Sequence, residues 1–536
     1  MYPSGYRDAF ARDSLPPRAQ WPELIFTLPR VRYPARLNAA VELLDRPVAA
    51  GHGSRVAFRT AHAAWRYADL LARTNQAARV LTEDMALVSG NRVLLRGFNS
   101  PMLVACLLGV LKAGGIPVPT MPLLRRAELR AICERAQITH CLCDARLRDE
   151  LPEGVGVREV RCFHDDELER TMAAKPPSFH AVDTAQDDVA LIAFTSGTTG
   201  APKGTMHFHR DLIAICDCAP PHLFKPAPED IFTGSSPLAF TFGLGGLVLF
   251  PMRYGASGVL LERPRPAALL EAIERHRASV LFTTPTAYRM MLSVIERYDT
   301  ASLRLCVASG EHLTPRDSDE WLAATGIRIT EVLGSTEMLH CFIGATGEQV
   351  RPGATGTVIP GYEARIVDAH MNELPTGHLG RLAVRGPTGC RYLADPRQRE
   401  QVVSGWNLTG DHYHRDEGGY FWFQGRADDL IISSGYNIGA PEVENALCRH
   451  PAVRECAVVG APDPVRGQIV KAFVALRDGY AAGDALSAEL QDFVKRSIAP
   501  YKYPRAVAYL DEFPRTETGK IHRARLREMS ANAAHP

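Results

Sequence analysis

The stretch RVLLRGFNSPMLVACLLGVLKAGGIPVPTM, residues 92–121, decides the fold class. It opens with an apolar run of strand length, continues after a short loop into an apolar segment of helix length, and closes on a second apolar run. A strand, a helix and a strand in this order predict a crossover unit whose two strands are parallel.

The same alternation continues beyond this unit. Residues 126–136 have the pattern of a helix, and residues 139–144 that of a strand. Further apolar strands are predicted at Val189–Phe194, Ala278–Thr283 and Leu303–Ala308. Repeated crossover units predict an α/β fold in which helices cover mostly parallel sheets.

The pattern changes twice toward the C-terminus. After Val358, shorter strands alternate with Gly and Pro turns, as in YEARIVDAHMNELPTGHLGRLAVRG (residues 362–386), which predicts a β-rich subdomain. Beyond GRADD, residues 425–429, a segment of about 110 residues predicts a compact α+β domain. We therefore expect a large N-terminal domain, residues 1–427, and a small C-terminal domain, residues 428–536.

Composition narrows the class of protein. Of the 536 residues, 46% are hydrophobic and 23% are charged, which is ordinary for a globular protein and excludes a disordered chain. The 61 Lys and Arg residues against 60 Asp and Glu residues leave a formal net charge of +1, so nothing predicts a nucleic-acid partner. The longest apolar run, Met102–Leu111, is shorter than the roughly 20 residues that span a bilayer, so no membrane partner is expected.

The cysteines and the N-terminus bear on the compartment. The opening MYPSGYRDAFARD has no apolar stretch of the kind that a secretory signal needs, so we expect a cytoplasmic protein. The 12 cysteines are then expected to be reduced thiols. Cys141 with Cys143, and Cys216 with Cys218, have C-x-C spacing instead of the C-x-x-C of most metal sites, which favours buried structural cysteines.

The segment TSGTTGAPKG, residues 195–204, is the strongest functional feature of the chain. It follows the apolar strand ALIAF directly and combines hydroxyl side chains, glycines and a lysine. Glycines let backbone N–H groups approach a phosphate, the hydroxyls donate hydrogen bonds, and the lysine adds charge. The residues predicted to bind phosphate are Thr195, Ser196, Gly197, Thr198, Thr199, Gly200 and Lys203.

Two other interpretations of this segment are weaker. A Walker A loop fails because Pro202 stands where the second glycine belongs and Gly204, not Ser or Thr, follows Lys203. A flexible Ser/Thr/Gly linker remains an alternative, although so dense a set of these residues seldom follows a buried strand by chance.

Further motifs extend this segment into a pattern that resembles the adenylate-forming superfamily, which includes acyl- and aryl-CoA synthetases, luciferases and peptide-synthetase adenylation domains. Residues 195–204 resemble its phosphate-binding signature. The other matching segments, in family order, are GSTE (Gly334–Glu337), GW with TGD (Gly405–Asp411), GRADD (Gly425–Asp429) and PRT with GK (Pro514–Lys520). The resemblance spans about residue 30 to 525, nearly the whole chain.

The resemblance implies that the protein binds ATP and Mg²⁺, and it assigns this binding to particular residues. Thr336 is expected to contact the nucleotide and Glu337 to help hold Mg²⁺, a cation that prefers oxygen ligands. Asp411 is expected to bind the ribose hydroxyls, with Arg426 also contacting the ribose. Taken alone, Glu337 is more often a surface carboxylate, and a TGD tripeptide is often only a turn.

The resemblance also implies a domain that moves between two half-reactions. Lys520 is the expected adenylation lysine, which without the other motifs would be a solvated loop lysine, and Asp428 is the expected hinge. Gly435 would line the passage for the thiol of coenzyme A, or form an ordinary turn. The turn Ser309, Gly310 and Glu311 resembles the one that flanks adenine, although a plain strand-to-helix connection explains it almost equally well.

The acid-binding side of the site has weaker signals. The segment Phe240–Gly245 and the string GSTEMLH (residues 334–340) resemble benzoate-type CoA ligases, and the N-terminal WPELIFTLPRVRYPARLNAAVELLD resembles 2-aminobenzoate-CoA ligases. Phe242 offers a flat apolar wall for a ring. Cys341 replaces a larger aliphatic residue of the benzoate ligases, which would leave room for an ortho substituent. The predicted substrate residues are Phe242, Gly243, His340 and Cys341. The alternative that these are ordinary core residues stays equally open.

One position departs from the benzoate ligases. These often carry a lysine in the segment after the hinge, and Ile432 stands at that place. Because that lysine is associated with the thioester-forming conformation, the coenzyme A half-reaction is expected to be arranged differently. Adenylation is not affected.

The leading hypothesis is an ATP-dependent aryl-CoA ligase that uses Mg²⁺, ATP, coenzyme A and an aromatic acid, and the expected acid is 2-aminobenzoate. A second hypothesis transfers the acyl group to a separate carrier protein, because no carrier domain is evident in the chain. A third hypothesis is a non-catalytic nucleotide-binding protein. The presence of Lys520, Glu337 and Asp411 at their matching places argues against it. The sequence leaves a monomer and a homodimer equally open.

Overall fold

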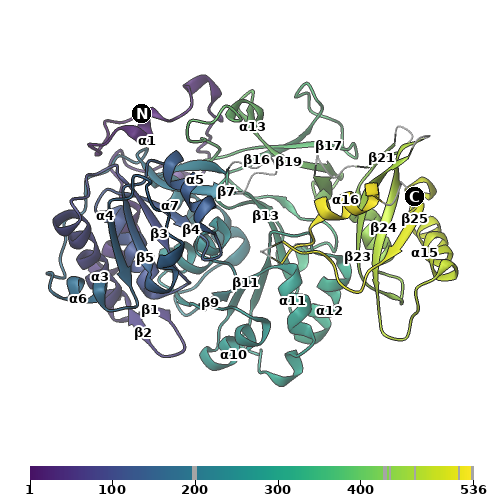
Figure 1. Ribbon diagram of the computed structural model, residues 1–536, viewed down its shortest axis with the longest axis horizontal. Helices are drawn as coiled ribbons and strands as arrows, with labels where there is room; N and C mark the ends of the chain where they lie inside the picture. Colours follow the sequence, from purple (N-terminus) through teal and green to yellow (C-terminus); the bar gives the residue numbers. More distant parts are fainter. Residues whose placement is uncertain (196–201, 427–430, 434–435, 464–465, 517–518, 533–536) are drawn as a thin grey trace.

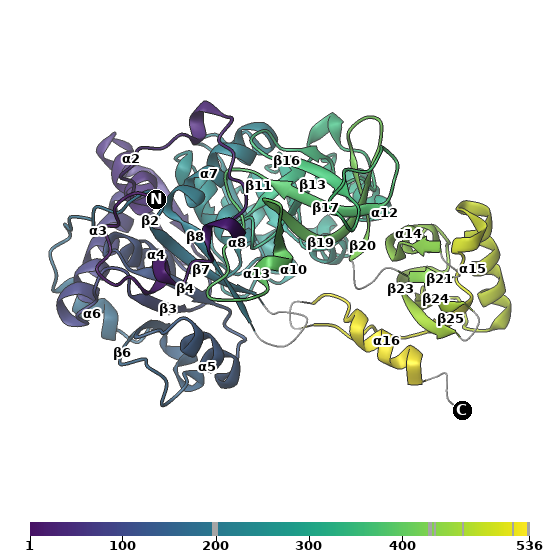
Figure 2. The ribbon, with the colours of Figure 1, turned by 90° about the horizontal axis from the view of Figure 1, so that it is seen from above.

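The computed structural model describes residues 1–195, 202–426, 431–433, 436–463, 466–516 and 519–532. The chain forms a large N-terminal part and a smaller C-terminal part, which is yellow in Figure 1. Figure 2 shows that the C-terminal part lies beside the N-terminal part, at the end opposite to α3 (Tyr67–Arg79). The predicted boundary between residues 427 and 428 lies outside the described residues and stays a prediction.

The largest sheet has nine strands in the order β15-β14-β13-β12-β11-β9-β10-β1-β2. Its strands from β13 to β1 are parallel, as the crossover pattern predicts. In chain order the strands are β1 (Val56–Arg59), β2 (Ala64–Arg66), β9 (Ile231–Gly234), β10 (Ser257–Val259), β11 (Val280–Thr283), β12 (Leu305–Ala308), β13 (Ile329–Gly334), β14 (Cys341–Gly344) and β15 (Thr357–Val358). Strands β10 and β11 flank β9, so the winding of the chain reverses there, which is where open α/β sheets bind ligands.

The stretch that decides the fold class forms a second sheet, which is fully parallel and has the order β4-β3-β5-β6. Its elements are β3 (Arg92–Arg96), α4 (Pro101–Lys112), β4 (Ile116–Thr120), α5 (Arg126–Arg135), β5 (His140–Asp144) and β6 (Glu159–Phe163). Every residue of α4 is buried. Its contact with α3 depends on Gly109, where a Cβ would lie 2.9 Å from the Cβ of Ala77. The predicted strand–helix–strand unit is confirmed.

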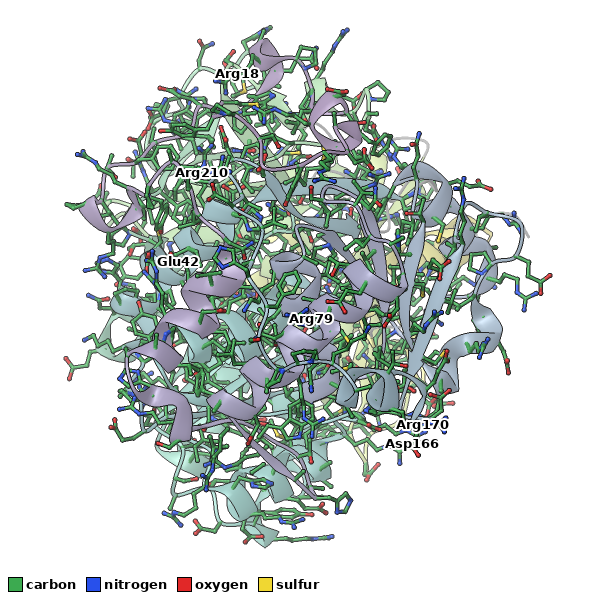
Figure 3. All side chains as sticks on the ribbon, turned by 90° about the vertical axis from the view of Figure 1, so that its left-hand side faces the viewer. Arg18, Glu42, Arg79, Asp166, Arg170 and Arg210 are labelled. Carbon is green, nitrogen blue, oxygen red and sulfur yellow. The ribbon has the colours of Figure 1, made fainter. Side chains whose placement is uncertain are left out.

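Helices cover the faces of these sheets (Figure 1). The other N-terminal helices are α1 (Phe10–Asp13), α2 (Arg46–Ala49), α6 (Glu167–Ala173), α7 (His209–Ala219), α8 (Thr241–Leu244), α9 (Phe250–Arg253), α10 (Pro266–His276), α11 (Pro285–Leu292), α12 (Pro315–Thr325) and α13 (Gln398–Gln401). Figure 3 shows charged side chains such as Glu42 and Arg79 on the side away from the C-terminal part. Within the described residues, no helix is both long enough and apolar enough to cross a membrane.

The predicted β-rich subdomain is a five-stranded sheet. It consists of β16 (Glu363–Val367), β17 (Gly380–Arg385), β18 (Val402–Val403), β19 (Trp406–Arg415) and β20 (Phe421–Arg426). Strands β19 and β20 are antiparallel, with Asp411 directly opposite Arg426. This register brings together two residues that the sequence analysis singled out.

The phosphate-loop segment connects two antiparallel strands. β7 (Val189–Thr195) pairs with β8 (Lys203–Phe208), with Thr195 opposite Lys203. Residues 391–393 continue the pairing on the other side of β8: Met206 N donates to Arg391 O (2.8 Å), and Thr205 bridges to Tyr392. Residues 196–201 lie outside the described residues.

A buried ion pair anchors this pairing. Arg391 and Asp211 have fully buried side chains, and Arg391 Nη2 donates to Asp211 Oδ2. Asp211 Oδ2 also accepts from Phe208 N at the start of α7 (2.9 Å), and the Arg391 guanidinium lies 4.0 Å from the Phe208 ring centroid. The pair therefore links the 391–393 segment to the hairpin and to α7.

The C-terminal part is an α+β unit, as predicted. Strands β22 (Tyr436–Ile438), β21 (Ile431–Ser433), β24 (Gly467–Leu476) and β23 (Val453–Asp463) form a sheet in this order, and β25 (Ala506–Tyr509) pairs with β24. The helices are α14 (Ala440–Leu447), α15 (Asp484–Ser497) and α16 (Arg523–Asn532). The apolar sides of α14, α15 and the sheet form a core of their own, which includes Val443, Val470 and Leu490.

The cysteines are structural, as expected. All 12 are free thiols, and all except Cys448 are buried. Cys141 and Cys143 lie on the buried strand β5, and Cys216 and Cys218 on α7.

The ion pair gives a prediction about stability. Arg391→Met leaves the Asp211 carboxylate buried without its partner, and should lower the free energy of unfolding by about 3–5 kcal/mol. Denaturant unfolding measures the change, with Arg399→Met, at an exposed position of α13, as the matched control. Equal unfolding midpoints for the two variants would contradict the anchoring role of the pair.

Candidate active site

The candidate site lies at the carboxyl ends of the parallel strands of the largest sheet. Strand β12 ends directly before Ser309, the first residue of one predicted motif, and β13 ends on Gly334, the first residue of another. At the reversal between β9 and β11, the Ser235 and Thr283 hydroxyls are hydrogen-bonded at 2.5 Å. Segments that are far apart in the sequence therefore converge on one edge of the sheet, which is the usual ligand-binding edge of such sheets.

Glu337 is held by a tyrosine that the sequence analysis did not find. The Tyr392 hydroxyl donates to Glu337 Oε1 at 2.6 Å. Lys203, at the start of β8, places its ammonium 4.9 Å from the centroid of the Tyr392 ring. Tyr392 thus connects the predicted phosphate lysine to the predicted metal ligand. It stands in the sequence GCRYLADP, which carries no motif that would single it out.

Thr336 is fixed through its backbone. His207 on β8 is fully buried, and burial lowers its pKa to about 3, so the ring is neutral at ordinary pH. Its Nε2 atom donates to the Thr336 carbonyl at 2.8 Å. This bond ties the loop after β13 to the phosphate hairpin. His207 is a second residue that the sequence analysis missed.

Thr195 ends β7 beside the phosphate loop. Its hydroxyl is buried and has no hydrogen-bond partner among the described residues. A buried hydroxyl is costly to leave unpaired, so a ligand oxygen would suit this position. The other predicted loop residues, Ser196, Gly197, Thr198, Thr199 and Gly200, lie outside the described part of the chain.

Asp411 and Arg426 form an ion pair across β19 and β20. Arg426 Nη1 lies 3.2 Å from Asp411 Oδ1, and Asp411 is almost fully buried. Burial raises the pKa of Asp411 to about 6; Arg426 opposes this shift and the charge of Glu337 adds to it. The electrostatic influence of Glu337 on Asp411 indicates that the two carboxylates lie near each other.

Lys520 reaches this site from the C-terminal part. Its Nζ atom lies 3.7 Å from the place that a Cβ on Gly310 would take, and Gly310 has a φ of +88°, which favours glycine. Lys520 is exposed, yet the protein around its ammonium desolvates it in part and lowers its pKa; Glu311 opposes this shift and Arg426 adds to it. The structure therefore brings Lys520 together with Gly310, Glu311 and Arg426.

Glu311 is oriented by the start of α11. Its Oε2 atom accepts hydrogen bonds from the Thr286 hydroxyl (2.6 Å) and from Thr286 N (3.2 Å). A carboxylate at a helix N-terminus is also favoured by the helix dipole. Glu311 is thus held beside Lys520 by the N-terminal part alone.

A second group of predicted residues forms an aromatic cluster next to Glu337 in the sequence. The ring of His340 lies 5.7 Å from the Phe242 ring centroid and 4.6 Å from that of Phe250. Its backbone neighbour is Gly245, where a Cβ would lie 2.3 Å from His340 Cδ2. Phe242 is only half-buried, whereas Phe250 and His340 are buried. The arrangement suits a flat apolar ring.

The polar atoms of this cluster are few. His340 is buried, and burial lowers its pKa to about 3, so the imidazole is neutral. Its Nδ1 atom is 3.1 Å from Cys341 Sγ, and its Nε2 atom has no hydrogen-bond partner among the described residues. Gly243 has no room for a side chain, because a Cβ would lie 2.3 Å from the Pro237 carbonyl oxygen.

The remaining predicted residues are placed as follows. Ser309 is nearly buried at the end of β12. Asp428, the predicted hinge, and Gly435, the predicted thiol passage, lie outside the described residues. Ile432 lies on β21, opposite Asn437 in the register.

The chain matches two family models. The AMP-binding enzyme model matches residues 46–392, and the model of the AMP-binding enzyme C-terminal domain matches residues 442–520. Benzoate–CoA ligase from Thauera aromatica is 34% identical over 514 residues, which covers 94% of this chain and 98% of that protein.

Two solved structures are also similar. The anthranilate CoA ligase AuaEII, crystallised with anthranoyl-AMP, has a TM-score of 0.88 and 29% identity, and covers 94% of this chain and 99% of its own. A benzoate CoA ligase from Burkholderia xenovorans LB400 has a TM-score of 0.84 and 29% identity, and the match covers 91% of this chain and 99% of that protein. The family resemblance of the sequence motifs is therefore confirmed. The chain belongs to the AMP-binding enzyme family, the adenylate-forming superfamily, as an AMP-forming acid–thiol ligase.

Proposed function

We propose that the protein is an ATP-dependent aryl-CoA ligase whose acid is 2-aminobenzoate. In the first half-reaction a carboxylate oxygen of the acid attacks the α-phosphorus of ATP, and pyrophosphate leaves. In the second, the thiolate of coenzyme A attacks the acyl carbonyl, and AMP leaves. One observation carries the proposal: Lys520 comes from the C-terminal part to lie beside Gly310, Glu311 and Arg426.

The proposed roles follow from the charges that the first half-reaction creates. Negative charge builds on the phosphate oxygens, and a fixed ammonium stabilises it best in a partly dry site. Lys520 supplies this ammonium near the α-phosphate, and Lys203 with Thr195 and the residues after it holds the departing phosphates. Asp411 accepts hydrogen bonds from the ribose hydroxyls, and Arg426 keeps that carboxylate charged.

Glu337 is the proposed ligand of Mg²⁺. The donor set fits this ion, because a carboxylate oxygen is the kind of ligand that Mg²⁺ prefers and phosphate oxygens complete its coordination. Tyr392 donates to Oε1 of Glu337 and thereby orients the carboxylate. When bound, Mg²⁺ supplies positive charge against the phosphate oxygens.

Two features support an aromatic acid with a polar ortho group. The Phe242 and His340 rings offer apolar walls, and His340 follows Glu337 closely in the same loop, which brings acid and phosphates together. The small Cys341 and the neutral imidazole of His340 suit an amino substituent, because a neutral imidazole nitrogen can accept its N–H. The anthranilate and benzoate ligases found by comparison support the same substrate class.

The second half-reaction is proposed to need a rotation of residues 428–536 about Asp428, after which Gly435 lines the path of the thiol. Ile432, in place of the benzoate-ligase lysine, bears on this step alone. Free coenzyme A is the proposed acceptor of the acyl group. The alternative acceptor is the phosphopantetheine thiol of a separate carrier protein.

Pyrophosphate release with a panel of acids tests the proposal. The panel holds 2-aminobenzoate, benzoate, 2- and 4-hydroxybenzoate, cinnamate and a medium-chain fatty acid, each with and without coenzyme A. We expect multiple turnovers with 2-aminobenzoate only when coenzyme A is present, and loss of release when EDTA removes Mg²⁺. Release with the fatty acid alone would exclude the aromatic pocket, and turnover that requires a carrier protein would exclude free coenzyme A.

Cys341→Ile tests the ortho side of the pocket. The larger side chain fills the proposed space, so kcat/KM for 2-aminobenzoate should fall at least about tenfold more than kcat/KM for benzoate, in line with about 1–3 kcal/mol per misfitting methylene. Cys106→Val, in the buried helix α4, is the matched control and should affect the two acids equally. Equal losses for both acids in Cys341→Ile would show that Cys341 does not shape this side.

A further inference from the structure

A line of charged side chains runs from the N-terminal part to the segment that carries Lys520. It begins at Asp317 on α12, which accepts two hydrogen bonds from Arg289 on α11, from Nε at 2.9 Å and from Nη2 at 2.8 Å. Arg289 Nη1 then lies 3.4 Å from Glu455 Oε1, on β23 of the C-terminal part. Figure 1 shows α11 and α12 on the side of the N-terminal part that faces β23.

Glu455 continues this line to the lysine segment. Both of its carboxylate oxygens accept from Arg515 Nη2, at 2.9 and 2.8 Å. Arg515 Nη1 in turn donates to the Gly519 carbonyl at 3.0 Å, directly before Lys520. The segment is closed by Thr516 N, which donates to the Lys520 carbonyl at 2.8 Å. Arg515 therefore holds the backbone on which the Lys520 side chain is mounted.

We propose that Glu455 and Arg515 are positioning residues for adenylation: through Arg289 they fix the Lys520 segment against the N-terminal part, so that the ammonium reaches the α-phosphate. The inference rests on the proposed role of Lys520. Glu455 is the shared member of the line, because one carboxylate contacts an arginine from each part. When the C-terminal part rotates away, the contact with Arg289 is lost and the lysine is withdrawn with it.

The geometry separates this line from an ordinary surface ion pair. Isolated exposed pairs contribute little, because water screens them and the side chains lose freedom. Here Glu455 is 17% exposed, and Asp317, which clamps Arg289, is 5% exposed. Linked charges in such a setting strengthen one another and restrict each other's motion. We therefore expect this line of charged residues to place the Lys520 side chain precisely and to contribute less to overall stability.

Other contacts hold the two parts together without involving Glu455. Arg316 on α12 donates from Nη1 to the carbonyls of Cys448 (3.0 Å) and Val453 (3.2 Å). Removing the Glu455 charge leaves these bonds intact. A loss of activity can then be attributed to the placement of Lys520 instead of to undocking of the C-terminal part.

Glu455→Gln tests the proposal in the two half-reactions measured separately. Formation of aryl-AMP from ATP and 2-aminobenzoate or benzoate should slow between about tenfold and 10²-fold, because a misplaced group loses catalytic power steeply. The fall should lie in kcat, with KM for ATP little changed. The rate of thioester formation from synthetic aryl-AMP and coenzyme A should stay within twofold of that of the unaltered enzyme. The melting temperature should change by no more than about 2 °C.

Two further variants sharpen the result. Asp492→Asn removes a carboxylate from an exposed pair with Lys495 on α15 and should leave both half-reactions unchanged. Arg289→Gln should reproduce the adenylation loss, and combining it with Glu455→Gln should add little, because residues of one network are not additive.

The outcomes are distinguishable. Normal adenylation by Glu455→Gln, in an enzyme that Lys520→Ala inactivates, would overturn the positioning role and leave the proposed function intact. Parallel loss of both half-reactions together with a lower melting temperature would also overturn it, in favour of a structural role. No aryl-AMP from the unaltered enzyme would overturn both proposals.

Discussion

The approach of Lys520 to Gly310 is the contact on which the site depends. Under the proposed function, several positive groups and hydrogen-bond donors neutralise the phosphates of ATP, and no single element of this fold supplies them all. The sheet edge provides Glu311, Glu337 and the phosphate hairpin, whereas Lys520, the proposed source of the ammonium, comes from the C-terminal part of the chain. Everything that holds the C-terminal part beside the N-terminal part therefore also sets the geometry of the chemistry.

Much of the fold could be predicted because its local signals agree with its tertiary structure. The apolar stretch at residues 92–121 became β3, α4 and β4, since a helix buried on all sides and strands of a parallel sheet both need continuous apolar runs. The motif residues Asp411 and Arg426 were expected in one site, and the register of β19 with β20 brings them together. Each of these two residues could be found because its own motif is one continuous piece of chain.

The supporting residues could not be found in this way. Tyr392 is paired with Glu337 because residues 391–393 lie along β8, and His207 is paired with the backbone of Thr336 because β8 lies beside the loop that follows β13. The Asp317–Arg289–Glu455–Arg515 line joins three regions that are far apart in the sequence. Each of these residues is an unremarkable polar residue in its own segment, and its role follows from contacts that composition and periodicity do not encode.

Measuring the two half-reactions of Lys520→Ala separately shows whether the docked lysine acts in adenylation. If the docked lysine performs adenylation, aryl-AMP formation should fall by about 10²–10³-fold, as when one group that stabilises transition-state charge is removed. Thioester formation from synthetic aryl-AMP and coenzyme A should persist, and Lys495→Ala, at an exposed position of α15, should change neither step. Near-normal aryl-AMP formation by Lys520→Ala would show that the docked lysine does not perform adenylation.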